Sequence, residues 1–317
     1  MERFAGYEVL ELLDDAGSSL IHRVRPVGAP AHAPDVVLKR LKPTAEGVSK
    51  LLDQFLNEVE ITMLLGHPNV VRGIGHGVAD GLHFVVLELV DGPDAYRLMT
   101  AMQRAGMAPD LGVALHICLS ALRGLHHAHN AMTIRGQPLR VVHRDVSPDN
   151  FLCARDGQVK LADFGIAKLS TMDVTTDPAL GIRGKLAYMS PERVRGEPCG
   201  PESDQFSAAL AFLELATFRA VYQKRSGMTD VDLRELVARA EVDVPRELPR
   251  KLGKCVKKAL APQPRKRFES CAEFADELTD AARDAGLRAG APELSELIGK
   301  LGLGRLSPRP KPARPTF

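Results

Sequence analysis

The feature that most constrains this chain is a polar run enclosed by apolar residues, Val141–Asn150, which reads VVHRDVSPDN. It places an acid, Asp145, five positions before an amide, Asn150. A second acid, Asp163, follows two short apolar segments, FLC and VKLA, that flank an Asp-Gly turn. Such segments predict a short hairpin, so the second acid would emerge at the end of a strand. The fold must therefore bring two acids and an amide to one place.

This set of side chains suits one kind of chemistry. Carboxylate and amide oxygens bind magnesium ions, and a further carboxylate can orient a hydroxyl group. Phosphoryl transfer needs positioning and charge neutralisation of this kind, with little covalent chemistry from the protein. The motifs follow one another within 23 residues, 143–165, which is not expected by chance.

The stretch resembles the catalytic loop of protein kinases, in which His-Arg-Asp and a downstream Asn precede Asp-Phe-Gly. The resemblance implies that Asp145 accepts or orients the substrate hydroxyl proton, and that Asn150 and Asp163 hold Mg²⁺. The chain departs from the family at Ser147, where the family usually carries a lysine. The wording HRDVSPDN with GKLAYMSPE is most similar to bacterial members of the eukaryotic-like serine/threonine kinase family.

The resemblance covers residues 7–285 and implies an α+β fold of two lobes with ATP between them. The small lobe, about 7–90, would be β-rich with one main helix, and the large lobe, about 91–285, would be helical. The tail, 286–317, is expected to be helical at most through Leu301 and then disordered, because LSPRPKPARPTF contains four prolines. A polyproline ligand for an adaptor domain is the alternative for this end.

The first strands predict a hairpin, Tyr7–Leu12 followed by Ile21–Val27, with LDDAGSS as its turn. This turn occupies the place of the glycine-rich loop that covers the ATP phosphates. The match is poor, because the three motif glycines fall on Asp14, Ala16 and Ser19 and only the neighbouring Gly17 is a glycine. Glycine matters there because the backbone must approach phosphate oxygens closely. The resemblance places Leu13, Gly17 and Ile21 against the nucleotide.

A basic strand residue and a helical acid form the next predicted contact. Residues 48–65 predict an amphipathic helix with an apolar stripe of Leu51, Leu52, Phe55, Val59, Met63 and Leu64. Glu58 lies on the same face as the stripe, and a buried carboxylate needs a cationic partner. The resemblance supplies Lys39, in the strand 35–42, as the phosphate-binding lysine, although that lysine alone also reads as a solvated strand residue. Glu60 competes for the role but points to another face.

Phe84–Glu88 is an apolar strand that resembles the end of the small lobe. The resemblance implies that Leu87 borders the adenine pocket and that the backbone of Glu88 and Val90 pairs with adenine.

The large lobe contains a predicted helix over residues 111–130 that ends with His126, His127 and His129. No acid or cysteine accompanies these histidines in sequence, so a structural or solvated role is favoured over a metal site. Downstream, an apolar helix opened by Asp204 resembles the buried helix that anchors the catalytic loop. Glu192 of Ser-Pro-Glu and Arg267 resemble the buried ion pair that ties the activation segment to this lobe.

Residues 166–189 resemble an activation segment. Arg144, next to the catalytic aspartate, suggests control by phosphorylation, since a phosphate could pair with its guanidinium. The candidate hydroxyls are Thr171, Thr175 and Thr176.

The missing lysine has a candidate replacement. The residue seven positions before Glu192, a threonine in most family members, is Lys185 here. Lysine and hydroxyl have exchanged places, so we expect Lys185 to supply the ammonium group to the γ-phosphate and Ser147 to take the part of the hydroxyl. The alternative is a degraded site with a solvent-facing Lys185.

Composition limits the partners. The 42 basic and 40 acidic residues nearly cancel, so neither nucleic acid nor an anionic membrane is expected as the main partner. Five scattered cysteines fit thiols in a reducing compartment, and we find neither a signal peptide nor a transmembrane run. The sequence therefore predicts a cytoplasmic protein that acts on proteins, with a regulatory protein plausible on the tail or the small lobe.

Three functional readings follow. The favoured one is an active serine/threonine kinase that uses ATP and Mg²⁺ in bacterial signalling. The alternative is a pseudokinase that acts as a scaffold or allosteric partner, because of the glycine-poor loop and Ser147. A small-molecule phosphotransferase of similar fold is disfavoured by the Ser-Pro-Glu segment and Asp204, which resemble features of kinases with peptide substrates.

Overall fold

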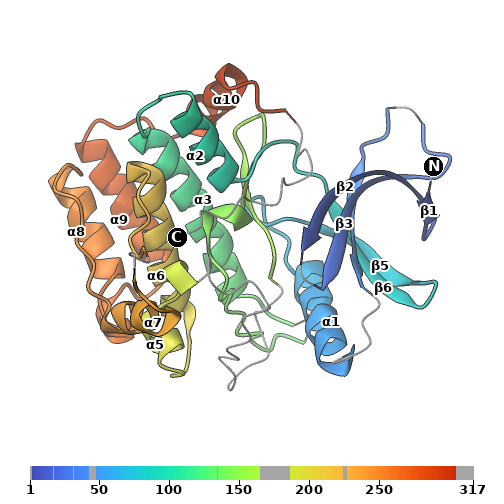
Figure 1. The fold of residues 1–317 in the computed structure, drawn as a ribbon, viewed down its shortest axis with the longest axis horizontal. Helices are drawn as coiled ribbons and strands as arrows, with labels where there is room; N and C mark the ends of the chain where they lie inside the picture. The colour runs from blue at the N-terminus through green and yellow to red at the C-terminus, as the bar shows by residue number, and fades with distance from the viewer. Residues whose placement is uncertain are drawn as a thin grey trace.

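Six antiparallel strands and one helix make up the first lobe of the computed structural model, which describes residues 2–16, 18–30, 32–42, 48–133, 135–164, 186–223 and 227–304 (Figure 1). The predictions for Gly17, Lys185, Thr171, Thr175 and Thr176 lie outside these residues, as does the proline-rich end of the tail.

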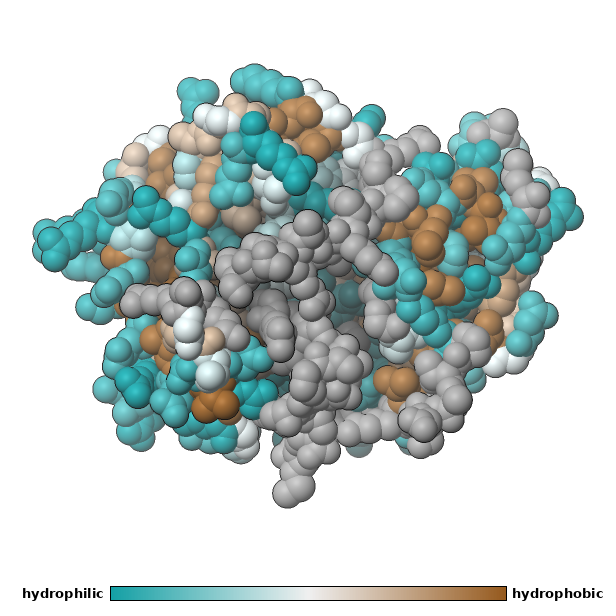
Figure 2. All heavy atoms as spheres, in the orientation of Figure 1, coloured by the Kyte–Doolittle hydropathy of each residue, from teal (hydrophilic) through white to brown (hydrophobic). Residues whose placement is uncertain are grey.

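The sheet has the strand order β1-β2-β3-β4-β6-β5, in which every neighbouring pair is antiparallel. Its strands are β1 (Arg3–Phe4), β2 (Tyr7–Ala16), β3 (Ser19–Pro26), β4 (Val36–Leu41), β5 (Gly73–Ala79) and β6 (Leu82–Glu88). The helix α1 (Val48–Leu64) packs on one face through Phe55 and Val59, which contact Val85 of β6. The other face has its own small core around Val24 and Leu38, and Figure 2 shows hydrophobic side chains gathered on this lobe.

Three details of this lobe differ from the sequence predictions. The predicted hairpin is present, but its turn is shorter than the predicted 13–19, because the strands extend into it: Asp14 pairs with Ile21 and Asp15 with Leu20. Lys42 also forms an ion pair with Asp15, which ties the β2 end to the end of β4. β5 was not predicted, since GIGHGVA has low strand propensity and owes its conformation to pairing with β6.

The third difference concerns α1, which ends at Leu64. Phe55 and Val59 are buried, as predicted for the apolar stripe. Met63 and Leu64 are each 38% exposed, so their predicted burial is wrong. Helical spacing defines a common face, but it does not decide whether another element covers the whole of that face.

The second lobe is helical, as the α+β expectation requires. Its helices are α2 (Ala95–Arg104), α3 (Leu111–His129), α5 (Pro191–Val194), α6 (Pro201–Thr217), α7 (Asp230–Arg239), α8 (Arg250–Ala259), α9 (Cys271–Asp284) and α10 (Ala291–Lys300). The short strands β7 (Phe151–Cys153) and β8 (Val159–Leu161) form the predicted hairpin. α6 is buried almost along its whole length, and Phe206 and Phe212 are completely enclosed. It therefore forms the centre of the large core.

Two connections hold the lobes in contact near the catalytic loop. Gly92 lies so close to the carbonyl oxygen of Cys153 that a Cβ atom would collide with it, which accounts for glycine at this position. On the other side, Val71 N donates to Leu161 O at 2.9 Å, and Asn69 Nδ2 donates to Val159 O at 2.9 Å. The chain that follows α1 is thus bonded to β8, the strand that leads to Asp163.

None of the helices in the described ranges is both long enough and apolar enough to cross a membrane.

Candidate active site

A buried carboxylate on α6 holds the start of the catalytic loop. Asp204 Oδ2 and Oδ1 accept hydrogen bonds from the backbone N–H groups of His143 and Arg144, each at 2.8 Å. Its Oδ2 also lies 2.8 Å from His129 Nε2. Burial alone would raise the pKa of Asp204, but the hydrogen bond and charge of His129 lower it below its ordinary value. Asp204 is therefore ionised and fixes Arg144 in its unusual left-handed conformation, with φ of 64°.

His143 joins this loop to the end of β8. Its Nδ1 accepts from Asp145 N at 3.2 Å, so Nε2 carries the proton and donates to Ala162 O at 3.0 Å. Its ring also packs on Phe164, with centroids 4.6 Å apart. Burial lowers the pKa of His143. The neutral ring thus connects the backbone of Asp145 to that of Ala162, the residue before Asp163, and holds the two at a fixed distance.

Asp145 and Asn150 are brought together directly. Asn150 Nδ2 donates to Asp145 O at 2.6 Å and to Asp145 Oδ2 at 3.1 Å. The amide nitrogen is thereby committed, so the oxygen Oδ1 remains as the group that can bind a cation. Asn150 O also accepts from Ala162 N at 2.9 Å, which places the loop beside the strand that delivers Asp163.

Asp163 supplies the second hard oxygen donor. Its side chain is 44% exposed, and its backbone adopts a φ of 65° that turns it out of the strand. A carboxylate and an amide oxygen are the ligand types that Mg²⁺ prefers. The residues present therefore fit the magnesium ion that the sequence motif implies.

Lys39 contacts two carboxylates at once. Its Nζ lies 2.5 Å from Glu58 Oε1 on α1 and 2.7 Å from Asp163 Oδ1. The predicted Lys39–Glu58 contact is thus present, and Glu60 is exposed on another face of the helix. Cross-strand neighbours of Lys39 are Ile21 and Val85.

The electrostatics of this cluster are unbalanced, because one cation serves two anions. Burial alone would lower the pKa of Lys39, but Asp163 and Glu58 raise it well above its ordinary value. Burial raises the pKa of Glu58 to about 7, with repulsion from Asp163 adding to the effect and Lys39 opposing it. Glu58 can therefore take up a proton near neutral pH.

The other predicted nucleotide-side residues line the small lobe or the link to the large lobe. Leu13 and Val90 are buried, and Ile21 and Leu87 are half-buried. The side chain of Glu88 is turned to Arg72 N at 2.8 Å and Lys160 Nζ at 2.9 Å. Ser147 is 1% exposed, and its Oγ has no hydrogen-bond partner among the residues that the structure describes.

The predicted Glu192–Arg267 pair is present and is supported by further hydrogen bonds. Arg267 Nη1 and Nη2 donate to Glu192 Oε1 and Oε2 at 2.7 and 2.8 Å, and both side chains are almost completely enclosed. Arg267 also donates to Glu202 O and Ala261 O at 2.9 Å, while Ser203 Oγ donates to Glu192 Oε1 at 2.6 Å. Burial alone would raise the pKa of Glu192, but Arg267 lowers it.

Sequence reasoning missed two buried polar contacts near the loop. His129 bridges Asp204 and Cys271, whose Sγ lies 3.7 Å from His129 Nδ1. Its place one turn after the buried Leu125 was a signal that could have found it, although not its partner. Tyr188 donates a hydrogen bond to Glu214, and burial raises the pKa of that carboxyl. No sequence spacing indicated this pair.

The chain is similar in sequence to known protein kinases. The family model for the protein kinase domain matches residues 27–278. The chain is 30% identical over 314 residues to the tyrosine-protein kinase MasK of Myxococcus xanthus, covering 98% of this chain and 48% of that protein. It is 26% identical over 286 residues to the serine/threonine-protein kinase PrkC of Bacillus subtilis, covering 88% of this chain and 41% of that protein. The chain thus spans about half the length of these relatives.

A solved structure gives the same picture of the fold. The crystal structure of the PknI kinase domain of Mycobacterium tuberculosis matches with a TM-score of 0.63 and 28% sequence identity, over 89% of this chain and 98% of that domain.

Proposed function

Because the chain belongs to the protein kinase domain family, we propose that it transfers the γ-phosphoryl group of Mg²⁺-bound ATP to hydroxyl groups of proteins. The observation that carries the proposal is the simultaneous contact of Lys39 with Glu58 and Asp163, beside the Asp145–Asn150 pair. These contacts bring together the strand β4, the helix α1 and two loops of the large lobe. The resulting site contains both a cationic group and carboxylates, as phosphoryl transfer requires.

The proposed roles follow from the groups that each residue presents. Lys39, held by Glu58, binds the α- and β-phosphates. Asn150 Oδ1 and the Asp163 carboxylate hold magnesium, which when bound neutralises charge on the transferring phosphoryl group. Leu13, Gly17, Ile21 and Leu87, with the backbone of Glu88 and Val90, surround the nucleotide.

Asp145 orients the acceptor hydroxyl and takes its proton. A new bond forms between the hydroxyl oxygen and the γ-phosphorus, while the bond from that phosphorus to the β,γ-bridging oxygen breaks and ADP leaves with the electron pair. The hydrogen bond from Asn150 Nδ2 to Asp145 Oδ2 fixes the orientation of this carboxylate.

Lys185 supplies to the γ-phosphate the ammonium group that the catalytic loop lacks, and Ser147 takes the part of the hydroxyl. The buried Ser147 hydroxyl without a partner in the described residues supports this part of the proposal, because such a group needs a polar neighbour. Lys185 is the candidate from sequence, and it lies outside the described residues.

We assign the acceptor to serine and threonine hydroxyls of proteins, with residues 7–285 as the catalytic domain and 286–317 as the tail. The relatives divide on this point, since PrkC is named a serine/threonine kinase and MasK a tyrosine kinase. A cytoplasmic location remains part of the proposal.

Control by phosphorylation is also proposed, with Thr171, Thr175 or Thr176 as acceptor and Arg144 as the group that pairs with the phosphate. Burial lowers the pKa of Arg193, with Asp145 and Asp204 opposing the effect and Arg144 adding to it, so Arg193 and Arg144 are two guanidinium groups close to the loop. Mass spectrometry of the autophosphorylated chain tests this, and phosphate absent from 170–176 would discard it.

The central test is Mg²⁺-dependent transfer of ³²P from ATP to the chain itself and to a generic basic protein, followed by phosphoamino acid analysis. We expect phosphoserine and phosphothreonine, and loss of transfer in Asp145→Asn. Equal transfer by Asp145→Asn would contradict the site assignment, and phosphotyrosine alone would contradict the acceptor class. A chain that gains thermal stability from Mg·ATP but transfers nothing would support the scaffold alternative.

A further inference from the structure

The first part of the tail is folded against the large lobe. The helix α10 contributes three buried side chains, Leu294, Leu297 and Ile298, to the large core. Figure 1 shows α10 at the outer edge of this lobe, where it contacts α3. The match to the protein kinase domain ends at residue 278, so the packed part of the chain extends past it.

The helix α10 also contacts the turn that joins β7 to β8. Ser295 Oγ donates a hydrogen bond to Arg155 O at 2.7 Å. A Cβ atom on Gly157 would lie 1.9 Å from Ala291 O, so the turn and the start of α10 meet backbone to backbone. From α3, His116 Nε2 donates to Gly157 O at 2.8 Å, because a carbonyl oxygen can only accept. The turn is therefore held between α3 and α10.

Arg155 links α10 to the connection between the lobes. Its backbone N–H donates to Asp91 O at 2.9 Å, while its carbonyl oxygen accepts from Ser295. Two residues earlier, Cys153 N donates to Pro93 O at 2.8 Å. The backbone of the turn is thus bonded to the interlobe connection on one side and to α10 on the other.

The hairpin that this turn closes leads to the two proposed magnesium ligands at its other end. β7 begins directly after Asn150, and β8 ends two residues before Asp163. Each strand has three residues, so only about 10 Å of strand separates the turn from the ligands. A two-stranded hairpin has little stability of its own, so its position depends on the elements packed against it. Whatever holds the turn therefore also holds Asn150 and Asp163.

We propose that α10 is a positioning element for these two ligands and that Ser295 is the positioning residue, acting through Arg155 O. The assignment of Asn150 and Asp163 to magnesium rests on the proposed function. The buried apolar side chains of α10 fix the helix on the lobe, and the Ser295 hydroxyl couples the helix to the hairpin. Without this hydroxyl the turn can move, and the two oxygen donors lose their alignment.

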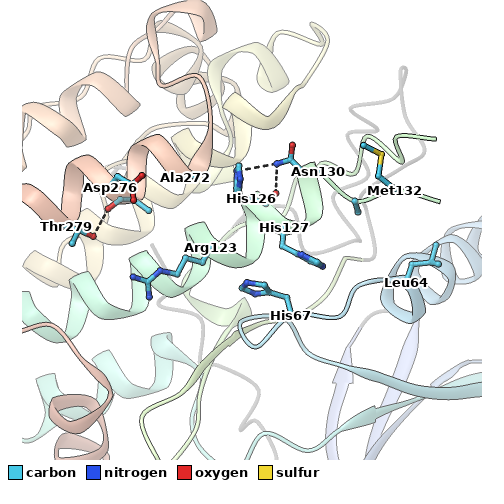
Figure 3. A pocket seen from close by; sticks show the side chains of 12 residues that line it. Leu64, His67, Arg123, His126, His127, Asn130, Met132, Ala272, Asp276 and Thr279 are labelled. Carbon is cyan, nitrogen blue, oxygen red and sulfur yellow. Dashed lines mark hydrogen bonds between the residues drawn. The ribbon is translucent and has the colours of Figure 1, made fainter. Parts of the chain in front are cut away.

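The test compares Ser295→Ala with Thr279→Val in the full chain. Thr279 Oγ1 on α9 donates to Ala275 O at 2.7 Å, so each change removes one hydroxyl-to-carbonyl hydrogen bond of the same length. Figure 3 shows Thr279 beside a hollow that, in the described part of the chain, neither the hairpin nor α10 lines. Hydrogen–deuterium exchange of the segment 151–163 measures the hold on the hairpin in the absence of metal and nucleotide.

Affinity for Mn²⁺ in the presence of ADP, measured by electron paramagnetic resonance, reports the metal site without phosphotransfer. We expect Ser295→Ala to speed exchange in 151–163 and to weaken Mn²⁺ binding about threefold. The Mg²⁺ concentration for half-maximal phosphotransfer should rise by a similar factor. Ser295→Thr, which keeps the hydroxyl, and Thr279→Val should both stay within about 1.5-fold of the unmodified chain.

A second pair of variants separates positioning from stability. Leu294 on α10 and Leu278 on α9 are both completely buried, so Leu294→Ala and Leu278→Ala should lower the Tm by similar amounts. Only Leu294→Ala should loosen 151–163 and weaken Mn²⁺ binding, by about 10-fold. Leu294→Val and Leu278→Val replace this pair if either alanine variant does not fold.

Three outcomes would overturn the proposal. These are unchanged exchange of 151–163 in Ser295→Ala and Leu294→Ala, faster exchange with unchanged Mn²⁺ affinity, and equal losses of Mn²⁺ affinity in the α9 controls. An unmodified chain without measurable Mn²⁺ affinity would remove the magnesium assignment and the positioning role with it. A chain that binds Mn²⁺ with ADP but transfers no phosphate would contradict the proposed function alone, since exchange and Mn²⁺ affinity would still decide the role of α10.

Discussion

Two buried ion-pair centres differ in how their charges are balanced. In the large lobe, Glu192 and Arg267 form two parallel hydrogen bonds, and two further donors of Arg267 are bonded to backbone carbonyls. Between the lobes, a single ammonium group on Lys39 is shared by Glu58 and Asp163. The first, Glu192 with Arg267, has one cation for one anion, and we call it the closed centre. The second, Lys39 with Glu58 and Asp163, has one cation for two anions, and we call it the open centre.

This difference separates a structural contact from one that can exchange partners. Arg267 lowers the pKa of Glu192, so this carboxylate keeps its charge. The pKa of Glu58 is raised to about 7 by burial, so this carboxyl can become neutral when its partner leaves. Asp163 is 44% exposed, whereas Glu192 is almost completely enclosed. The second centre can therefore accept phosphates and metal without leaving a buried charge stranded.

The largest effect is expected when the closed centre is broken. Arg267→Met should lower the free energy of unfolding by about 3–5 kcal/mol, because it leaves the buried Glu192 charged and unpaired. Urea denaturation followed by circular dichroism measures the change. The double variant Glu192→Met/Arg267→Met should cost much less than the sum of the single changes, since no charge is then stranded. A loss of under ~1 kcal/mol in the free energy of unfolding of Arg267→Met would contradict the structural role of the Glu192–Arg267 pair.

The open centre should respond in activity more than in stability. Lys39→Met should reduce phosphotransfer on the order of 10²–10³-fold, the effect of removing one charged donor from a reacting group. Its free energy of unfolding should fall by only about 1 kcal/mol, because Glu58 can take up a proton in place of its partner. Lys42→Met, which removes a lysine from the surface pair with Asp15, is the matched control. Equal activity of the two variants would refute the role of Lys39.

A third experiment asks whether the open centre gains its further cation from Lys185. Lys185→Ala should reduce turnover on the order of 10²-fold and leave nucleotide affinity within about threefold, because the lost charge acts on the transferring phosphoryl group. The exchange variant Ser147→Lys/Lys185→Thr should restore much of the activity, since it returns the ammonium group to the catalytic loop. Unchanged turnover in Lys185→Ala would show that Lys185 does not supply this cation.

The smallest effect concerns pH. As pH falls from about 8 to about 6, Glu58 takes up a proton and weakens its hold on Lys39, so the affinity for Mg·ATP should decline a few-fold. Glu58→Gln should lower the affinity and remove most of this slope. Titration of ATP itself is common to both proteins, so the difference between the two profiles isolates Glu58. Parallel profiles would show that Glu58 does not titrate in this range.

Sequence reasoning located the parts of these centres that depend on local pattern or family resemblance. Helical phase distinguished Glu58 from Glu60, and short motifs placed Asp145, Asn150 and Asp163. The second contact of Lys39, with Asp163, could not be foreseen, because the two residues are 124 positions apart and meet only when the lobes take their relative positions.

The features that sequence reasoning predicted wrongly or did not predict have a common physical cause. The exposure of Met63 and Leu64 depends on what other elements cover, which helical spacing does not contain. The strand β5 depends on its neighbour β6 and not on its own glycine-rich sequence. In each case tertiary context decided the outcome.

Three consecutive residues at the start of α6 join the closed centre to the catalytic loop: Glu202 O accepts from Arg267, Ser203 Oγ donates to Glu192, and Asp204 accepts from His143 N and Arg144 N. Successive residues of a helix are set about 100° apart, so their directions cannot vary independently. A small rotation of α6 would displace the catalytic loop and the Ser-Pro-Glu segment by correlated amounts. The first turn of α6 therefore sets the position of the catalytic loop relative to the Ser-Pro-Glu segment.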